Sequence, residues 1–144
     1  MKTAKQRPIV RLTKKLNIGS GTFLLDGYVN IDVAAAPYKE IIMDANALAF
    51  KDEVFDEVLS DSCLITVEEL KEAAVAEAFR VLRSGGKCSL WVYGYELEDA
   101  KRIASSFGEI INVELKNDAF GLTEYEVTLI KYKGAAVAPG GDVL

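Results

Sequence analysis

Short runs of strand-forming residues alternate with helix-like patterns along most of the chain. Apolar, β-branched and aromatic residues gather in seven runs separated by polar or glycine-containing segments: residues 15–18, 28–33, 40–45, 55–60, 87–93, 110–115 and 124–132. Runs of this length that alternate with helical segments are typical of a sheet with helices packed against it. We therefore expect an α/β fold with a sheet of about seven strands.

Two segments between these runs have helical periodicity. In residues 67–86, apolar side chains recur every three or four positions: Leu70, Ala74, Ala78 and Val81 or Leu82. Acidic residues come first, arginines come last, and Gly85 and Gly86 follow, which is the order that a helix dipole and a glycine stop favour. Residues 96–107 repeat the pattern more briefly, with Gly108 as the stop. Both segments are predicted to be helices.

The last two strand-like runs form a pair by pattern. Residues 110–115 and 124–132 show two-residue alternation, and the NDAFGLT segment links them. Its Asn117, Asp118 and Gly121 are residue types that turns favour. The sequence therefore predicts an antiparallel hairpin at the C-terminal end of the sheet.

Length and composition indicate one folded domain. The chain has 144 residues, half of them hydrophobic, which is enough to bury a substantial core. We expect the domain to span residues 15–133, between a basic N-terminal arm over residues 1–14 and a flexible tail over residues 134–144.

The net charge of −5 conceals an uneven distribution. Six of the 17 Lys and Arg residues, and none of the 22 Asp and Glu residues, lie in the first fifteen positions: Lys2, Lys5, Arg7, Arg11, Lys14 and Lys15. The remainder therefore carries 11 − 22 = −11 and repels a phosphate backbone, so nucleic acid is not an expected partner unless the arm supplies the contact. The arm has no apolar core of signal-peptide length, and no run of apolar residues is long enough to span a membrane, so we expect a cytoplasmic protein.

The chain has no histidine, which excludes the commonest general base and the commonest metal ligand. Chemistry must then use carboxylates, hydroxyls, lysine or tyrosine, or a cofactor that is itself reactive. Cys63 and Cys88 lack the spacing of a redox or metal motif and are expected to be small buried side chains. We expect no metal site.

A glycine-rich segment follows the first strand-like run. In NIGSG, Gly19 and Gly21 would let a ligand approach the backbone at the carboxyl end of a strand, and Asp32 ends the next run. A carboxylate there can accept hydrogen bonds from both ribose hydroxyls of a nucleoside. The alternative is that the glycines make only a tight turn and that Asp32 is a solvated turn acid or a helix cap. Asp32 also comes thirteen residues after Gly19, whereas a dinucleotide site has about twenty.

The order of motifs over residues 15–133 resembles the class I S-adenosylmethionine-dependent methyltransferases, in particular their small bacterial and phage members. NIGSG is followed by the acid of NID, then MDANALAF, the strand FDEVLSDS, a helix ending RVLRSGGK, and the final hairpin. Each motif is weak alone, but the ordered set is moderately specific. The resemblance implies a Rossmann-like sheet, mostly parallel with a C-terminal antiparallel hairpin.

The resemblance also implies S-adenosyl-L-methionine as the cofactor and assigns cofactor-binding positions: Gly19, Ser20, Gly21, Asp32, Asp44, Ala45 and Ser60. In the family, an acid at the place of Asp44 faces the adenine amino group, and the next backbone amide, here Ala45, faces a ring nitrogen. Ser60 would open the loop after the fourth strand, which cradles the methionine part. Asp44 could equally be a cap.

The first crossover is too short for the family's usual first helix. Eight steps separate Ser20 from Tyr28, at most about 28 Å of extended chain, and the return along a four-residue strand takes about 13 Å. Parallel strands normally need a dozen or more connecting residues. We therefore expect a first crossover helix that is missing or reduced, with one flank of the cofactor more exposed than usual.

Methyl transfer is compatible with the absence of histidine, because the cofactor brings an activated methyl group and the enzyme mainly positions the reactants. If the acceptor must lose a proton, the candidates for receiving it are Asp61, Tyr93 and Tyr95. No NPPY-type motif is present, which disfavours methylation of a DNA base or of glutamine. The expected acceptor is a small molecule or a surface group, with a partner subunit or a second copy as a possible completion of the site.

Two other functions stay open from the sequence. A protein that keeps the fold and the nucleoside pocket but does no chemistry, acting as a binding or scaffold protein, is favoured by the short chain, which lacks a substrate-recognition lid. A nicotinamide-binding Rossmann protein is disfavoured by the missing third glycine and first helix.

Overall fold

The computed structural model describes residues 13–19, 24–32, 41–45, 47–61, 71–119 and 121–133. Predictions for the N-terminal arm, the C-terminal tail, Ser20 and Gly21 lie outside these residues, except for Thr13 and Lys14 at the end of the arm. The described strands are β1 (Lys15–Ile18), β2 (Tyr28–Asp32), β3 (Ile41–Ile42), β4 (Phe55–Asp61), β5 (Leu82–Tyr93), β6 (Gly108–Ala119) and β7 (Leu122–Lys131). The helices are α1 (Lys71–Val81), the 3-10 turn η1 (Gly94–Glu96) and α2 (Leu97–Ala104).

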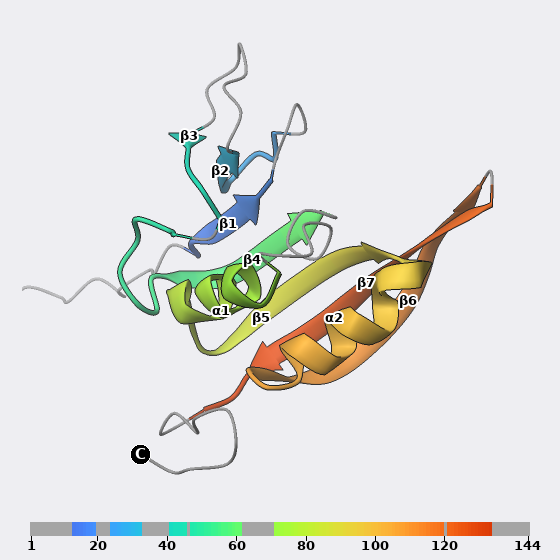
Figure 1. The fold of residues 1–144 in the computed structure, drawn as a ribbon. Coiled ribbons are helices and arrows are strands. Elements are labelled where there is room, and N and C mark those ends of the chain that lie inside the picture. The colour runs from blue at the N-terminus through green and yellow to red at the C-terminus, as the bar shows by residue number, and fades with distance from the viewer. Residues whose placement is uncertain are drawn as a thin grey trace, which may run out of the picture.

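The strands form one mixed sheet in the order β3-β2-β1-β4-β5-β7-β6 (Figure 1). The first five strands pair in parallel, and β7 runs antiparallel to both β5 and β6. The predicted α/β sheet, mostly parallel with a C-terminal antiparallel hairpin, is therefore confirmed. Because five neighbouring strands are parallel, their carboxyl ends lie along one edge of the sheet.

Helices α1 and α2 lie side by side in front of the sheet in Figure 1 and contact each other. One cluster of buried side chains joins the two helices to the strands. Its fully buried members include Val58, Val75, Phe79, Leu90 and Leu129. The rings of Phe79 and Phe107 stack, with centroids 5.4 Å apart. Burying an apolar side chain of this size contributes about 1.5–3 kcal/mol, so this layer supplies much of the folding free energy.

The first predicted helix ends earlier than its glycines suggested. Helix α1 stops at Val81, and the next residue, Leu82, already pairs with Phe55 of β4. From there β4 advances 57 − 55 = 2 residues to its next pair, whereas β5 advances 87 − 82 = 5. Gly85 has a φ of +75°, and a Cβ on Gly86 would lie 2.9 Å from the carbonyl oxygen of Asp56. The two glycines therefore build an irregularity in β5 and do not cap the helix.

The second predicted helix is also shorter. Helix α2 ends at Ala104, and Gly108 begins β6 and is not the helix stop. A Cβ on Gly108 would lie 2.7 Å from the carbonyl oxygen of Ile130. Glycine is therefore needed there because strand β7 passes so close.

The predicted hairpin is present but its turn is tighter than NDAFGLT suggested. Asn117 and Asp118 belong to β6 and pair with Glu124 and Thr123 of β7. The ladder continues to the pair of Ala119 with Leu122, so only the two residues between them connect the strands. Of the three predicted turn residues, Gly121 alone is in the turn, with a φ of +76°.

The connection between β1 and β2 consists of residues 19–27, and none of its described residues, 19 and 24–27, is helical. The side chain of Asn30 in β2 anchors this connection. Its side-chain oxygen accepts hydrogen bonds from the Leu25 N–H (3.0 Å) and from Asn17 Nδ2 (2.9 Å), and its amide group donates to the carbonyls of Leu25 (3.1 Å) and Tyr28 (3.2 Å). The polar pair of Asn17 and Asn30 thus holds this short link. A crossover helix would instead need apolar side chains on the strands to pack against.

Among the described residues, no helix is both long enough and apolar enough to cross a membrane.

Candidate functional site

The predicted site residues that the structure describes lie along the carboxyl edge of the parallel strands. In sheet order they are Asp44 and Ala45 after β3, Asp32 at the end of β2, Gly19 after β1, Ser60 and Asp61 in β4, Tyr93 at the end of β5 and Tyr95 in η1. Neighbouring strands lie about 4.8 Å apart, so β3 and β4 are separated by about 14 Å along this edge. The edge can therefore contact both ends of one extended ligand.

Gly19 has a backbone conformation that favours glycine. Its φ is +71°, in the left-handed region that favours glycine, and its N–H donates to the carbonyl of Ile31 at 2.9 Å. The chain therefore leaves β1 in a sharp turn beside the end of β2. A side chain at this position would strain the turn.

Backbone hydrogen bonds hold the chain around Asp32 and Asp44. The carbonyl of Asp32 accepts a hydrogen bond from the Met43 N–H at 2.8 Å, and the carbonyl of Asp44 accepts one from the Ala47 N–H at 3.0 Å. Asp32 is half-buried and Asp44 is exposed. The Asp44–Ala45 pair therefore lies in a turn directly beyond β3, next to the end of β2.

Ser60 differs from its prediction. It lies inside β4, pairs with Ile18 and Leu90, and is 1% exposed. The strand-like run 55–60 includes it, whereas the family resemblance placed it at the start of the loop after the strand. The strand extends through Asp61 because its pairing with β5 continues to Trp91. The Asp61 side chain lies outside the described part of the structure.

Tyr93 and Tyr95 form a stacked pair at the β5 end of the edge. Their ring centroids are 5.8 Å apart and the ring planes differ by 9°. Tyr93 is half-buried, whereas Tyr95 is 78% exposed. The N–H of Tyr93 donates to the carboxylate of buried Glu96 at 3.2 Å, which fixes the backbone of this turn.

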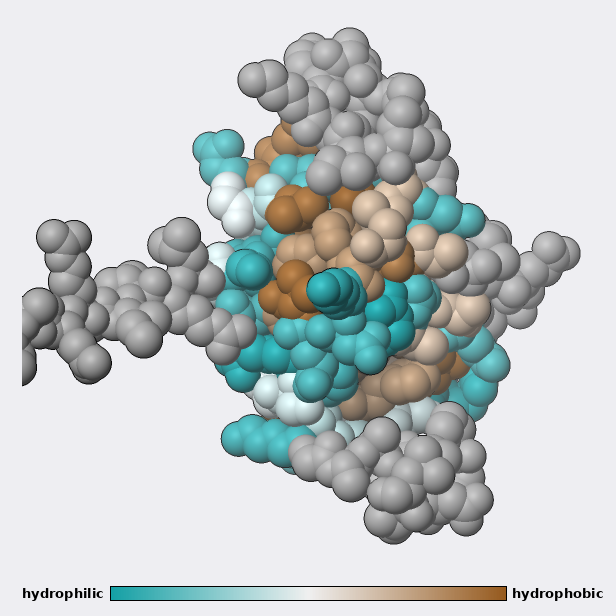
Figure 2. Space-filling model, turned by 90° about the vertical axis from the view of Figure 1, so that its left-hand side faces the viewer, coloured by the Kyte–Doolittle hydropathy of each residue, from teal (hydrophilic) through white to brown (hydrophobic). Residues whose placement is uncertain are grey.

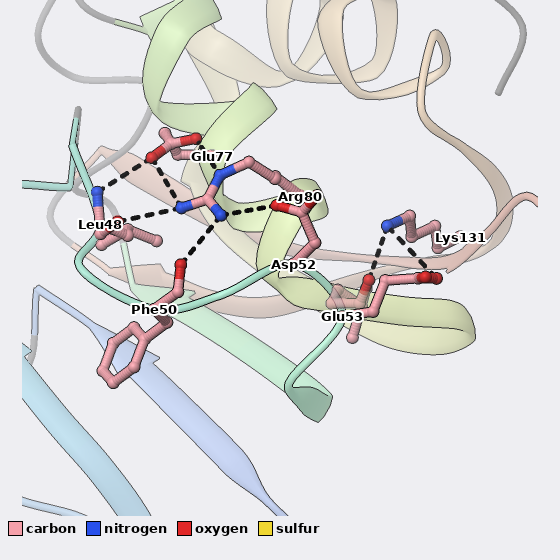
Figure 3. A network of polar contacts seen from close by, with 8 residues as sticks. Leu48, Phe50, Asp52, Glu53, Glu77, Arg80 and Lys131 are labelled. Carbon is pink, nitrogen blue, oxygen red and sulfur yellow. Dashed lines mark hydrogen bonds and ion pairs between the residues drawn. The ribbon is translucent and has the colours of Figure 1, made fainter.

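Glu77 and Arg80 of α1, which the sequence pattern indicated only as helical positions, hold the segment beyond β3 (Figure 3). Arg80 donates from Nε to Glu77 at 2.6 Å, from Nη2 to Glu77 at 3.1 Å and to the Leu48 carbonyl at 2.9 Å, and from Nη1 to the Phe50 carbonyl at 2.9 Å and to Asp52 at 2.8 Å. Glu77 in turn accepts the Leu48 N–H at 3.0 Å.

The electrostatics of this network follow from its geometry. Hydrogen bonds from Arg80 lower the pKa of Glu77, although burial acts in the opposite direction. The two carboxylates of Glu77 and Asp52 raise the pKa of Arg80 in return. Seen from the left-hand side of Figure 1, hydrophobic surface in brown borders hydrophilic surface in teal (Figure 2).

A hollow at the other end of the strands does not match the predicted site. It is lined by Thr13, Asp56, Glu57, Arg83, Gly85 and Lys87, near the amino ends of β1 and β4. Its charges neutralise one another, because Arg83 pairs with Asp56 at 2.8 Å and Lys87 with Glu57 at 3.9 Å. The carboxyl edge, where ligands bind to open α/β sheets, is therefore the candidate site.

The part of the chain that the structure describes contains no group of three or more acidic, cysteine or histidine residues that could hold a metal ion.

Comparisons with known proteins agree with this architecture. Residues 26–90 match a family model described as a methyltransferase domain. No curated protein sequence matches the chain significantly.

Solved methyltransferase structures share the fold. An S-adenosylmethionine-dependent methyltransferase from Methanosarcina mazei has a TM-score of 0.70 and 16% identity, over 85% of this chain and 94% of that one. The 1,6-didemethyltoxoflavin-N1-methyltransferase of Burkholderia thailandensis, solved with 1,6-didemethyltoxoflavin and S-adenosylhomocysteine, has a TM-score of 0.69 and 16% identity, over 85% and 72% of the two chains. The N-methyltransferase NodS of Bradyrhizobium japonicum, solved with S-adenosylhomocysteine, has a TM-score of 0.68 and 13% identity, over 84% and 79%.

At these identities the structural likeness concerns the fold, and the match to the methyltransferase-domain model covers residues 26–90, less than half of the chain. The chain is therefore similar to methyltransferases in part of its sequence and in its fold.

Proposed function

We propose that this protein binds S-adenosylmethionine along the carboxyl edge of its parallel strands and transfers the methyl group to a small molecule or a surface group. The observation that carries the proposal is the arrangement of Gly19, Asp32 and the Asp44–Ala45 turn. They follow or end three adjacent strands, β1, β2 and β3, in the order of the sheet. The family match supports the same cofactor.

The chemistry of these groups fits the two ends of the cofactor. The carboxylate of Asp32 can accept hydrogen bonds from ribose hydroxyls, and the Ala45 N–H and the Asp44 carboxylate can bind the adenine edge. Gly19 lets the ligand approach the backbone closely at the next strand. The methionine end would then lie toward Ser60 and β4.

When bound, S-adenosylmethionine supplies a methyl group already activated on a sulfonium. The protein's contribution is to hold the acceptor atom in line with that group and to exclude water. The cofactor would supply the methyl carbon to the acceptor, and its sulfur would keep the electrons of the broken carbon–sulfur bond. An acceptor that must lose a proton passes it to water or to a nearby base, for which Asp61, Tyr93 and Tyr95 are the candidates.

Titration calorimetry tests the cofactor assignment. We expect S-adenosylmethionine and S-adenosylhomocysteine to bind, and NAD to give no heat. Asp32→Ala and Asp44→Ala should each weaken S-adenosylhomocysteine by about 1–3 kcal/mol, the cost of leaving hydrogen-bonding groups unpaired. Asp118→Ala, an exposed acid on the hairpin, is the matched control. Unchanged affinity in both site variants with folding intact would remove the site from this edge.

A second measurement separates the enzyme from a non-catalytic nucleoside-binding protein. The protein is incubated with S-adenosylmethionine and with metabolite and protein fractions of a cell extract, and formation of S-adenosylhomocysteine is followed. We expect turnover with at least one fraction and none with S-adenosylmethionine alone. Binding without turnover in any fraction, including fractions of protein, would favour the scaffold function.

A further inference from the structure

Helix α1 binds the backbone of the segment beyond β3 more completely than packing alone requires. A guanidinium has five N–H donors, and all five of Arg80 have an acceptor. Two of these acceptors are the carbonyls of Leu48 and Phe50, and the N–H of Leu48 is bound by Glu77. Side chains of α1 therefore bind both the N–H and the carbonyl of Leu48, and the carbonyl two residues later.

This anchoring brackets the turn that carries Asp44 and Ala45. On one side, the Met43 N–H is bound to the carbonyl of Asp32 in β2. On the other, Leu48 is bound to α1. Only four residues, 44 to 47, lie between the two anchors, and the Ala47 N–H is bound back to the carbonyl of Asp44. Asp44 itself is exposed, so burial of its side chain does not fix its position.

We propose that Arg80 and Glu77 are positioning residues for the nucleoside end of the cofactor site, because they hold the Asp44–Ala45 turn in its binding conformation before the ligand arrives. The inference rests on the proposed function. It gives Arg80, the first arginine of the RVLRSGG motif, a role other than stabilising the end of the helix. The side chains of Arg80 and Glu77 are 32% and 21% exposed, so their charge-assisted hydrogen bonds are only partly screened by water.

Preorganisation has a thermodynamic signature that a purely structural contact lacks. If the turn is loosened, the ligand must order it on binding, and the cost falls on the entropy of binding. Arg80→Lys keeps the charge but cannot supply the planar set of five donors. We expect about tenfold weaker binding of S-adenosylhomocysteine, with a less favourable binding entropy and faster hydrogen exchange at the amides of Ala47 and Leu48 in the free protein.

Arg83→Lys is the matched control, because Arg83 lies just beyond the same helix but pairs with Asp56 at the opposite end of the strands. It should leave the affinity for S-adenosylhomocysteine unchanged. Glu77→Gln is the second variant, since it keeps the shape of the side chain and tests the network if Arg80→Lys folds poorly. It should weaken binding in the same direction.

The outcomes distinguish this inference from the function beneath it. No binding of S-adenosylhomocysteine to the wild-type protein would overturn the proposed function. Binding to the wild type with unchanged affinity in a folded Arg80→Lys or Glu77→Gln variant would overturn the positioning role alone. An equal loss of affinity in Arg83→Lys would also overturn it, because the effect would not be specific to the turn.

Discussion

At the residue scale, Asn17 and Asn30 explain how the sheet tolerates a nine-residue link between two parallel strands. The two side chains stand on paired positions of β1 and β2, and Asn30 binds both backbone groups of Leu25 in the link. Asparagine can do this because one side chain offers an acceptor and two donors. An apolar residue at either position would instead need a helix to cover it.

Asn30→Ala should therefore lower the free energy of unfolding by about 1–3 kcal/mol, because it leaves the N–H and carbonyl of Leu25 without their side-chain partner. Urea unfolding followed by circular dichroism measures this. The exposed Asn112 of β6 provides the control, and Asn112→Ala should change stability by less than about 0.5 kcal/mol. Equal effects in the two variants would contradict the role of Asn30.

Cys88 offers a test of the core. It is fully buried in β5, and burial raises the pKa of its thiol to about 12. Because the thiolate is the reactive form, Cys88 should not react with a disulfide reagent at neutral pH in the folded protein. In a Cys63→Ser background, we expect one thiol to react only after denaturation. Rapid reaction in native buffer would show that this part of the core is open.

Glu77 makes the acid stability of the protein depend on the Arg80 network. Arg80 lowers the pKa of Glu77 in the folded state, so the unfolded chain takes up this proton at a higher pH than the folded chain does. The stabilisation is fully present above the unfolded pKa of about 4.3 and is lost as the pH falls through the lower folded value. Between about pH 5 and pH 3, the wild type should therefore lose more unfolding free energy than Glu77→Gln does. Parallel pH profiles in urea denaturation would contradict this.

At the element scale, the boundaries of the elements were harder to predict than their order. All seven strand-like runs correspond to strands, because alternating or apolar runs between polar segments are a local signal. The glycines were misassigned, because Gly-Gly after a helical pattern has the same sequence signature whether it caps a helix or opens an irregularity in the next strand. Only the pairing of Leu82 with Phe55 decides between the two.

The Arg80 network was missed for a related reason. Its partners Leu48 and Phe50 lie about thirty residues away in sequence, and Arg80 binds their backbone carbonyls, which carry no residue-specific signal. By contrast, Gly19, Asp32 and Asp44 follow strand ends directly, so their placement along one edge could be predicted from strand order alone. That a ligand contacts these three residues remains a prediction.

Gly108 gives an element-scale prediction. A Cβ at this position would lie 2.7 Å from the backbone oxygen of Ile130 and 3.1 Å from the ring of Phe79, so the two strands would have to separate. We expect Gly108→Ala to destabilise the protein by about 1–3 kcal/mol, the range of overpacking. Ser106→Ala, two residues earlier on the exposed surface, should be nearly neutral. The difference is measured by thermal unfolding.

At the scale of the whole molecule, the site depends on the sheet as a unit. Its predicted parts come from the ends of five strands, β1 to β5, and the turn beyond β3 is held by α1, which follows β4. A ligand that bridges β3 and β4 would therefore stabilise elements across most of the parallel sheet. Ligand binding and global unfolding should be coupled.

This coupling can be measured without knowing the acceptor. A ligand that binds only the folded state stabilises it by RT ln(1 + [L]/Kd), which is about 2.7 kcal/mol when its concentration is one hundred times Kd. Even if the short first crossover makes the affinity modest, S-adenosylhomocysteine at that ratio should raise the unfolding free energy by this amount and raise the melting temperature with it. The same concentration should stabilise Asp32→Ala much less, because the ratio falls with the affinity. A wild-type protein whose melting temperature does not respond to S-adenosylhomocysteine at any concentration would exclude a cofactor site built from these strands.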